Sequence, residues 1–575
     1  MSRTTDPETL RVGNCSGFYG DRLSAMREML TGGELDVLTG DYLAELTMLI
    51  LGRDRIADPA AGYARTFLAQ LRDCLRLALD RGVRIVANAG GVNPAGLVAA
   101  IRELGSPAPR IALVHGDDLT ARAGVLGLGS PLGAHAYLGA FGIARALAAG
   151  ADIVVTGRVT DASLLIGPAI AHFGWGRTDF DALAGATVAG HVIECGTQAT
   201  GGNYPFFTEI DDLVRPGFPV AEIHRDGSSV ITKHPGTGGA VTVGTVTAQI
   251  VYEVDDARYA GPDVTTRLDT VSLRQAGPDR VEITGVRGEA PPPDVKVACT
   301  AIGGYRNEMT VVLTGLDIEA KAELFRRQFT AARGTEPAEV TWTLARLDAP
   351  DAPTQQQASA LLTVVARDPD EKVAGRAFTG AAVEVALASY PGFFATAPPG
   401  RAHPYGVFTA GYVPQDVPAH EVVFDDGTAE RIDPPPLTRP LAALSGPDPE
   451  AAPDDPGPTR RLPLGTLAGA RSGDKGGNAN VGLWVRDDAA YPWLAALITE
   501  DSVRELLPEA ATLPVHLTRL PAIRAVNVVV EGLLGQGVAY HARFDPQAKG
   551  LGEWLRSRHV EIPESLLDNV GKEER

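Results

Sequence analysis

The chain has 575 residues, of which 44% are hydrophobic and 21% are charged, and its formal net charge is −19. This length corresponds to about two to four domains, and the composition is that of a globular protein with a large core. An acidic chain has no general basic surface for nucleic acid or anionic membranes, so we expect neither as a partner. A small anionic substrate then requires a local positive site.

The expected compartment is the cytoplasm. The first ten residues lack the apolar stretch of a secretory signal, and no run of about 18 apolar residues occurs in the chain. The four cysteines, Cys15, Cys74, Cys195 and Cys299, show no C-x-x-C spacing, so they give neither a disulfide framework nor a zinc signature. Cys74 and Cys299 fall in helix and strand patterns typical of a core, whereas Cys15 and Cys195 fall in expected loops.

Apolar strands alternate with helices over residues 11–190, and this pattern predicts a layered α/β domain with a mostly parallel sheet. We expect helices at 21–33, 42–52, 63–82, 93–105 and 140–149. No G-x-G-x-x-G follows the first strand, so an NAD signature is absent. Five apolar strands end in short clusters of small or polar residues: VGNCSG (12–17), VLTGDY (37–42), IVANAGGVNP (85–94), ALVHGDD (112–118) and IVVTGRVTD (153–161).

Residues 191–445 show hairpins and two helices, at 316–334 and 371–389, and are predicted as an α+β region packed on the first domain. The segments 234–245 and 300–310 are expected to be glycine-rich turns. A Pro- and Asp-rich linker at 446–460 precedes a small C-terminal α+β domain at 461–567, whose order of elements favours a ferredoxin-like fold.

The five strand ends predict where the functional site lies. The carboxyl ends of parallel strands meet at one edge of a sheet, where backbone N–H groups and short side chains converge on a ligand. Asp41 is a candidate general base or cation ligand, with Glu45 one turn later facing the same site. An equally weighted alternative is that Asp41 only caps the following helix.

Three further strand ends supply candidates for substrate binding. Asn88 and Asn93 flank two glycines in a loop suited to a carboxylate or phosphate oxygen, or form an ordinary turn. His115 and Asp117 follow the fourth strand. Arg158 after the fifth strand is suited to an anion, or is paired with Asp161, which is either catalytic or a helix cap.

The segment HVIECGTQATGGNY (191–204) is predicted as a reactive loop. Glu194 is the preferred acid, base or cation ligand there. Cys195 is a weaker candidate: a cysteine at a helix N-terminus has a lowered pKa, but no histidine adjoins it in sequence and most free cysteines are inert. If a metal such as Mg²⁺ is used, its candidate ligands are Asp41, Asp117 and Glu194.

The segment GARSGDKGGNANVGL (469–483) is predicted as a C-terminal loop that binds an anion through Arg471, Lys475 and Asn478. It lacks the Walker A spacing, so an NTPase is not supported. CoA as part of the substrate is one source of such an anion.

Six motifs together resemble the acyclic terpene utilisation family AtuA: RVGNCSGFYGDR, LTGDYLAELTM, ANAGGVNP, VTGRVTDASL, HVIECGTQATGGNY and ARSGDKGGNANVGL. The resemblance spans almost the whole chain. It implies a large N-terminal domain followed by a ferredoxin-like domain, and an association with bacterial breakdown of citronellol- and geraniol-type acids as CoA thioesters.

The leading hypothesis is a catabolic enzyme that performs hydratase- or lyase-type acid–base chemistry on a small organic acid or its acyl-CoA thioester. One alternative is a non-catalytic acyl-CoA-binding or scaffold subunit. Another is a Mg²⁺-dependent phosphate-ester or polyphosphate hydrolase. The sequence leaves homo-oligomerisation open.

Overall fold

The computed structural model describes residues 8–442 and 457–567, and the chain divides into two compact units. Unit 1 covers the described residues up to Thr300, those of Phe408–Gly535 and those from Gln547 on. Unit 2 covers Ala301–Val407 and Gln536–Pro546. Residues 446–456 of the expected linker lie outside the described residues. Of the helices in the described ranges, none is long and apolar enough to cross a membrane.

Unit 1 is built on a sheet with 11 strands in the described part of the chain. Its centre is parallel, in the order β1-β2-β3-β6-β4, and antiparallel strands extend both edges. The predicted α/β class is thus confirmed. The central strands are β1 (Thr9–Asn14), β2 (Val37–Gly40), β3 (Arg84–Ala87), β6 (Ile153–Thr156) and β4 (Ile111–His115). The edge strands are β7 (Pro219–His224), β8 (Ser229–Lys233), β12 (Arg280–Thr284), β11 (Ser272–Gly277), β19 (Glu421–Val423) and β20 (Ala429–Arg431).

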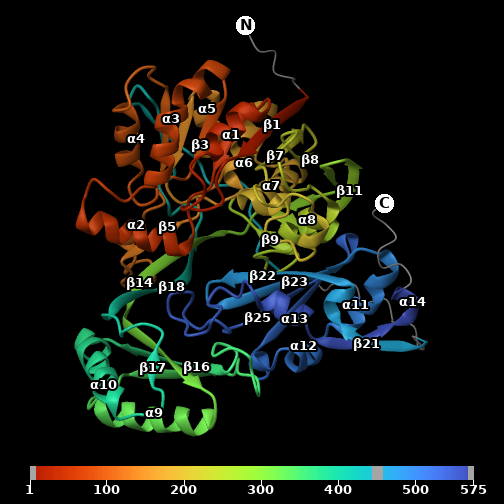
Figure 1. Ribbon diagram of the computed structural model, residues 1–575. Coiled ribbons are helices and arrows are strands. Elements are labelled where there is room, and N and C mark those ends of the chain that lie inside the picture. Colours follow the sequence, from red (N-terminus) through yellow and green to blue (C-terminus); the bar gives the residue numbers. More distant parts are fainter. Residues whose placement is uncertain (1–7, 443–456, 568–575) are drawn as a thin grey trace. The chain divides into compact units, whose positions relative to one another are not determined.

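Helices cover both faces of the central strands, which explains why these strands are apolar throughout. Neighbouring residues point to opposite faces, so Ile153 joins the core with α3 and α4 while Val154 joins the core with α6 and α7. Figure 1 shows α3 and α4 on one side of β3 and α7 on the other. The helices of this part are α1 (Ala25–Gly32), α2 (Glu45–Ala57), α3 (Arg65–Arg81), α4 (Pro94–Arg102), α5 (Phe141–Ala148), α6 (Ser163–Phe173), α7 (Phe180–Glu194) and α8 (Val243–Ile250).

One expected turn proves to be strand. The segment 300–310 lies inside β14 (Asp294–Thr314), which pairs with β5 (Gly133–Ala136) through residues 297–300 and with β16 (Ser359–Asp368) from Tyr305 on. Gly304, at φ +138°, lies where the strand changes partner, and pairing on both sides of it keeps the segment extended. A separate small sheet contains β9 (Arg258–Ala260), β10 (Thr265–Arg267) and β13 (Arg287–Glu289).

Unit 2 has an antiparallel sheet with helices packed on it. Phe325 and Phe329 of α9 and Phe378 of α10 form its core together with β14 and β16. Figure 1 shows α9 and α10 in the green to teal part of the chain. Its elements are α9 (Ile318–Ala332), β15 (Glu339–Ala345), β16, α10 (Phe378–Glu384), β17 (Phe394–Ala395) and the first part of β18 (His403–Pro414).

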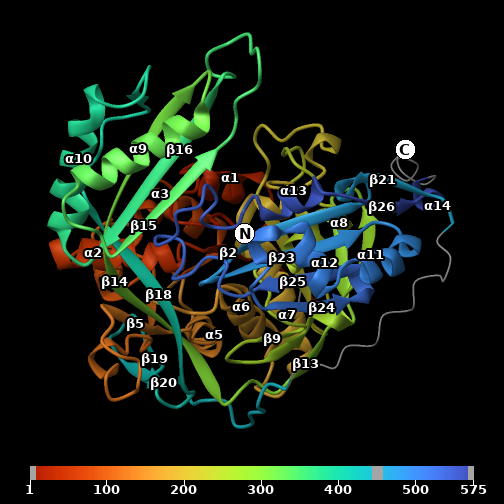
Figure 2. The ribbon, with the colours of Figure 1, turned by 90° about the horizontal axis from the view of Figure 1, so that it is seen from below.

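The C-terminal domain, within unit 1, is a four-stranded antiparallel sheet in the order β22-β23-β25-β24 with helices on one face. Figures 1 and 2 both show β23 and β25 side by side. The segment 469–483, predicted as a loop, is instead a hairpin whose strands meet at Gly476–Gly477. The elements are β21 (Thr459–Pro463), β22 (Ala468–Lys475), β23 (Asn478–Val485), α11 (Tyr491–Leu497), α12 (Glu500–Leu506), β24 (Val515–Leu520), β25 (Ala525–Val530), α13 (Leu551–Arg556), β26 (His559–Pro563) and α14 (Glu564–Leu567).

The second face of this sheet packs against the rest of unit 1. Side chains alternate along the hairpin, so Val481 and Leu483 join the helices while Gly473 and Gly482 face the chain that leaves α8. A Cβ at Gly482 would stand 2.3 Å from Cβ of Val251, which shows that glycine permits this close approach. The contact brings the charged end of the hairpin to the strand ends of the parallel sheet.

Candidate functional site

The structure gathers five charged side chains near the carboxyl ends of the parallel strands. We call them the strand-end cluster: Asp41, Glu45, Arg158, Asp161 and Glu194. Each interacts electrostatically with at least one other member. They come from four segments: the residues after β2, the start of α2, the residues after β6 and the end of α7.

Asp41 is held by its neighbours rather than acting as a helix cap. The cap of α2 is Ala44, three residues further on. Asn88 Nδ2 donates to Asp41 Oδ1 over 2.6 Å, and the backbone N–H of Leu43 donates to the same oxygen over 3.1 Å. Asp41 is 6% exposed and Asn88 is fully buried, so the structure fixes the carboxyl before any ligand arrives.

Arg158 is buried with donors unused. Its backbone N–H donates to Asp117, its Nη2 donates to Asp161 Oδ1 over 2.9 Å, and its guanidinium carbon lies 4.2 Å from the centre of the Tyr137 ring. Nε and Nη1 are buried and make no hydrogen bond. Because an unsatisfied buried donor costs free energy, these two groups mark a place where an anionic or carbonyl oxygen would be stabilised.

Glu194 is the last residue of α7, and hydrogen bonds from the end of β1 hold this end of the helix. Asn14, at the end of β1, donates through Nδ2 to the carbonyl oxygens of Ile193 and Glu194 at 2.7 and 2.9 Å. Glu194 Oε1 lies 2.9 Å from His191 Nδ1, one helical turn earlier. Its second oxygen, Oε2, is buried without a hydrogen-bond partner. One carboxyl oxygen is therefore occupied and the other is free to meet a ligand.

Three of the four carboxyl groups of the cluster have a raised pKa. Burial first, and then the charge of Asp161, raise the pKa of both Asp41 and Glu194 well above the ordinary values. Burial also raises the pKa of Asp161, although 31% of its side-chain surface stays accessible. A carboxyl group with a raised pKa takes up a proton more readily than an ordinary carboxylate, which suits acid–base chemistry.

Glu45 behaves in the opposite way. Burial opposes its ionisation, but Lys296 and Arg158 outweigh burial and lower its pKa. The Tyr137 hydroxyl donates to Glu45 Oε1 over 3.2 Å. The Lys296 ammonium lies 5.0 Å from the centre of the Tyr137 ring. Glu45 is therefore the carboxylate of the cluster that stays ionised, and its charge balances the cations around it.

The hairpin β22–β23 adds cations from the C-terminal domain. Lys475 Nζ donates to the backbone carbonyl of Glu253 over 2.6 Å and lies 5.4 Å from the centre of the Tyr259 ring. Its charge acts on both His191 and Glu194. Arg471 donates to Gln198 and lies over the ring of Tyr252, and its Nε is buried without a partner.

Family models match both parts of this arrangement. The model of the acyclic terpene utilisation family protein AtuA matches residues 10–424, and that of the AtuA ferredoxin-like domain matches residues 462–561. The chain belongs to the AtuA family. The strand-end cluster lies within the first match, and Arg471 and Lys475 lie within the second. The second match also confirms the predicted ferredoxin-like fold. A comparison with curated proteins gives no match.

Cys195 lies where a thiolate is disfavoured. Cys195 precedes only a short 3₁₀ helix, Gly196–Thr200, and it also ends the much longer helix α7, whose C-terminal dipole is negative. Burial, and next the charge of Glu194, raise the pKa of the Cys195 thiol well above its ordinary value. The geometry of this AtuA member therefore does not support a nucleophilic role for Cys195.

Several predicted site residues have other roles. Asn93 caps α4 by accepting the N–H of Gly96. Asn478 accepts the N–H of Gly532, and His115 faces Glu421 at 3.7 Å. None of these three is brought to the cluster by an observed contact, whereas Asn88 is. Asp117 Oδ2 lies 2.9 Å from His135 Nδ1 and also accepts the backbone N–H of Arg158. Asp117 therefore supports the backbone of Arg158.

The predicted metal ligands are not arranged as a set. In the described ranges, no group of three or more His, Cys, Asp and Glu side chains is placed to hold a metal ion. Asp117 Oδ2 already accepts from both His135 and Arg158. The residues present therefore do not fit the proposed site of Asp41, Asp117 and Glu194.

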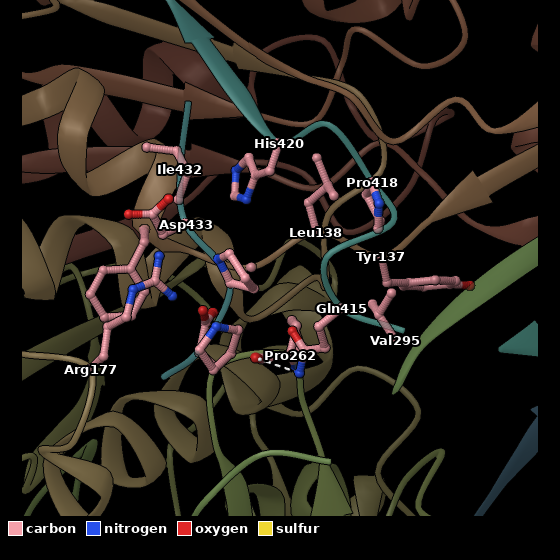
Figure 3. A pocket seen from close by; sticks show the side chains of 15 residues that line it. Tyr137, Leu138, Arg177, Pro262, Val295, Gln415, Pro418, His420, Ile432 and Asp433 are labelled. Carbon is pink, nitrogen blue, oxygen red and sulfur yellow. Dashed lines mark hydrogen bonds between the residues drawn. The ribbon is translucent and has the colours of Figure 1, made fainter. Parts of the chain in front are cut away.

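A separate small cavity has Tyr137 among its lining residues (Figure 3). Its volume, ≈ 30 Å³, is that of one or two water molecules, and pockets for small ligands are several times larger. Arg177, Asp263 and His420 are among the polar residues that line it. None of the predicted site residues lines this cavity, so the strand-end cluster remains the candidate site.

Sequence reasoning missed five residues around the cluster: Tyr137, His191, Glu253, Tyr259 and Lys296. The spacing of His191 and Glu194 was the one available signal, because residues three apart in a helix lie on one face. Lys296 belongs to β14, and Tyr259 to a small sheet far along the chain, so no local pattern pointed to them.

Proposed function

We propose that this AtuA member is a catabolic enzyme that adds or removes protons next to the carbonyl group of a small organic acid or its acyl-CoA thioester. The reaction class is hydration, dehydration or lyase chemistry. One observation carries the proposal: two buried carboxyls that favour protonation, Asp41 and Glu194, lie in one electrostatic cluster with Arg158, whose Nε and Nη1 have no partner.

The three residues have distinct roles in this proposal. Arg158 binds the carboxylate or carbonyl oxygen of the substrate and stabilises the negative charge that develops on it. Asp41 is the base, because donors from Asn88 and Leu43 stabilise its ionised form while burial keeps it basic. Glu194 is the acid, because its free oxygen receives no donor and its carboxyl holds its proton.

The C-terminal domain completes the site in this proposal. Lys475 adds a positive charge near Glu194, and Arg471 offers an unused buried donor on the same hairpin. A CoA thioester carries phosphate groups that such cations bind. The family is linked to acyclic terpene utilisation, so CoA thioesters of branched acyclic terpenoid acids are the first substrates to examine.

A thermal-shift screen against CoA thioesters, free organic acids and dicarboxylates tests the proposal, followed by mass spectrometry of each stabilising compound after incubation with the protein. We expect a product with the composition of water addition, water loss or carbon–carbon cleavage. Asp41→Asn, Glu194→Gln and Arg158→Gln should each reduce turnover at least 100-fold, since single acid–base groups contribute about 10²–10⁴-fold. Asn93→Ala is the control, because it changes a neighbouring loop outside the cluster.

Two results would overturn the proposal. Stabilisation by a CoA thioester without any product would favour a binding or scaffold subunit. Full turnover in a folded Asp41→Asn protein would remove Asp41 as the base.

A further inference from the structure

Three side chains from neighbouring segments of chain form a row, which we call the cation row: Arg158, Tyr137 and Lys296. The backbone N–H of Tyr137, next to β5, donates to the carbonyl of Lys296 in β14 over 2.9 Å. On the other side, Leu138 pairs in parallel with Val159, which sets Tyr137 beside Arg158. Residues that pair across neighbouring strands point to the same face, so the three side chains lie next to one another.

The ring of Tyr137 lies between two cations. The guanidinium carbon of Arg158 is 4.2 Å from the ring centre, and the ammonium of Lys296 is 5.0 Å from it. Neighbouring strands are about 4.8 Å apart, so two cations that are two strands apart are separated by about 10 Å. The Tyr137 hydroxyl donates to Glu45 Oε1 over 3.2 Å, which fixes the ring as a spacer between the two charges.

Both cations have donors to spare. Arg158 has a side chain that is 3% exposed, and its Nε and Nη1 are buried without a partner. Lys296 is partly buried and lies 5.5 Å from the ring of Phe408 as well. Within residues 8–442 and 457–567, its ammonium makes no hydrogen bond and no ion pair. Because buried cations are normally paired, two unpaired positions in one row point to a missing anionic partner.

We propose that the cation row binds two acidic groups of one ligand, the first at Arg158 and the second at Lys296, so that the acid part of the substrate is a short dicarboxylate. Two charge-assisted hydrogen bonds of about 2.8 Å fit into a gap of about 10 Å when the acid has about four to six carbons. The inference rests on the proposed function, in which Arg158 binds the acidic group of the substrate, and it makes Lys296 a specificity-determining residue.

The competing explanation is that Lys296 only offsets the charge of Glu45, which acts on both cations. Asp161, for its part, accepts from Arg158 Nη2 and leaves the other two donors unused. A lysine that only offsets a charge contributes to stability and does not distinguish between ligands. A lysine that binds the second acidic group sets a preference for dicarboxylates over monocarboxylates.

The first test needs no knowledge of the natural substrate. The full chain is titrated with unbranched dicarboxylates from malonate to suberate, and with monocarboxylates of the same chain lengths. Thermal shift and calorimetry measure the affinities at constant ionic strength, since salt screens charged contacts. We expect the tightest binding for four to six carbons, and a preference of about 10-fold or more over the matched monocarboxylate, because hydrogen bonds between charged groups are strong.

The second test removes one end of the row. Lys296→Met keeps the length of the side chain but not its charge. It should lower the affinity for the best dicarboxylate to that of the matched monocarboxylate, whose own affinity should not change. Lys296→Arg keeps the charge and should keep the preference.

A cation over an aromatic ring elsewhere provides the matched control. The guanidinium carbon of Arg326, in unit 2, lies 5.9 Å from the centre of the Trp342 ring. Arg326→Met should leave both affinities unchanged. Circular dichroism and thermal melting check that each variant is folded.

Two results would overturn the inference. One is a wild-type protein that binds dicarboxylates no better than monocarboxylates, and this result does not depend on any variant. The other is a folded Lys296→Met protein that keeps the preference, which would leave Lys296 only the role of offsetting Glu45. Turnover of monocarboxylic acids or their thioesters without a dicarboxylate preference overturns the inference but not the proposed function. A preference that depends on Lys296 in a protein without turnover overturns only the proposed function.

Discussion

The two ends of the Asn88 side-chain amide make hydrogen bonds to Asp41 and to Tyr42, the residue that follows Asp41. Nδ2 donates to Asp41 Oδ1 over 2.6 Å, and Oδ1 accepts the backbone N–H of Tyr42 over 2.8 Å. One fully buried side chain at the end of β3 thereby fixes both the carboxyl and the backbone of the neighbouring strand end. The orientation of Asp41 depends on a residue 47 positions away in sequence.

Replacing Asn88 should therefore affect stability and activity together. Asn88→Ala leaves the Tyr42 N–H without its acceptor and removes one donor from Asp41, which should cost about 1–3 kcal/mol of unfolding free energy. Turnover should fall more than binding, because the proposed base is no longer held in position. Urea denaturation and steady-state kinetics measure the two effects.

Asn93→Ala is the comparison for this variant. It removes the cap of α4 and should cost about 1 kcal/mol with unchanged turnover. Equal losses of turnover in the two variants would contradict the specific role of Asn88.

The sequence predicted the parallel strands and their polar ends because both are local patterns. An apolar run followed by Gly, Asn or Asp marks the place where a buried strand reaches the surface, and Asp41, Asn88 and Arg158 could be placed in this way. His191 gave a weaker signal, since it lies inside an apolar helix. Lys296 and Tyr137 reach the cluster through pairing between distant strands, which the sequence does not encode locally.

The prediction of a loop at residues 469–483 was wrong for a different reason. Four glycines and several polar residues in 469–478 are typical of a loop, yet the alternation of side chains is that of strands. Gly473, Asn480 and Gly482 lie on the face that packs against the chain after α8, so packing within the folded unit outweighs local preference.

Glu194→Gln should stabilise the protein more at higher pH. An unfolded glutamate ionises near pH ~4.3, whereas the folded pKa of Glu194 is raised by burial and by Asp161. Between these values the folded state holds a proton that the unfolded state has lost, so wild-type stability decreases as pH rises through this window. The amide has no such dependence.

Thermal melting of both proteins from pH 4 to pH 9 measures this effect. The difference in Tm should be small at pH 4 and grow in favour of Glu194→Gln toward pH 9. A constant difference across the range would show that Glu194 is ionised in the folded protein near its ordinary pKa.

Cys195 should be dispensable. Its thiol has a pKa raised first by burial and next by the charge of Glu194, so the reactive thiolate is scarce at neutral pH. Cys195→Ala should retain turnover within about threefold, since removing one small buried side chain changes packing only modestly. Iodoacetamide should modify the residue slowly at pH 7.5, as mass spectrometry of peptides would report. Loss of turnover in a folded Cys195→Ala protein would restore the nucleophilic hypothesis.

Gly482 should be required for docking of the ferredoxin-like domain on the rest of unit 1. A Cβ there would lie 2.3 Å from Cβ of Val251 and 2.8 Å from the backbone oxygen of the same residue. Gly482→Val should therefore cost about 1–3 kcal/mol, the usual range for overpacking, and displace Lys475 from Glu253. Limited proteolysis measures whether the domain is still docked, and turnover measures the effect of displacing Lys475. Gly277→Ala is the control, because no atom lies within 4 Å of a Cβ at that position. Unchanged turnover in a Gly482→Val protein whose docking is lost would show that the hairpin cations take no part in the reaction.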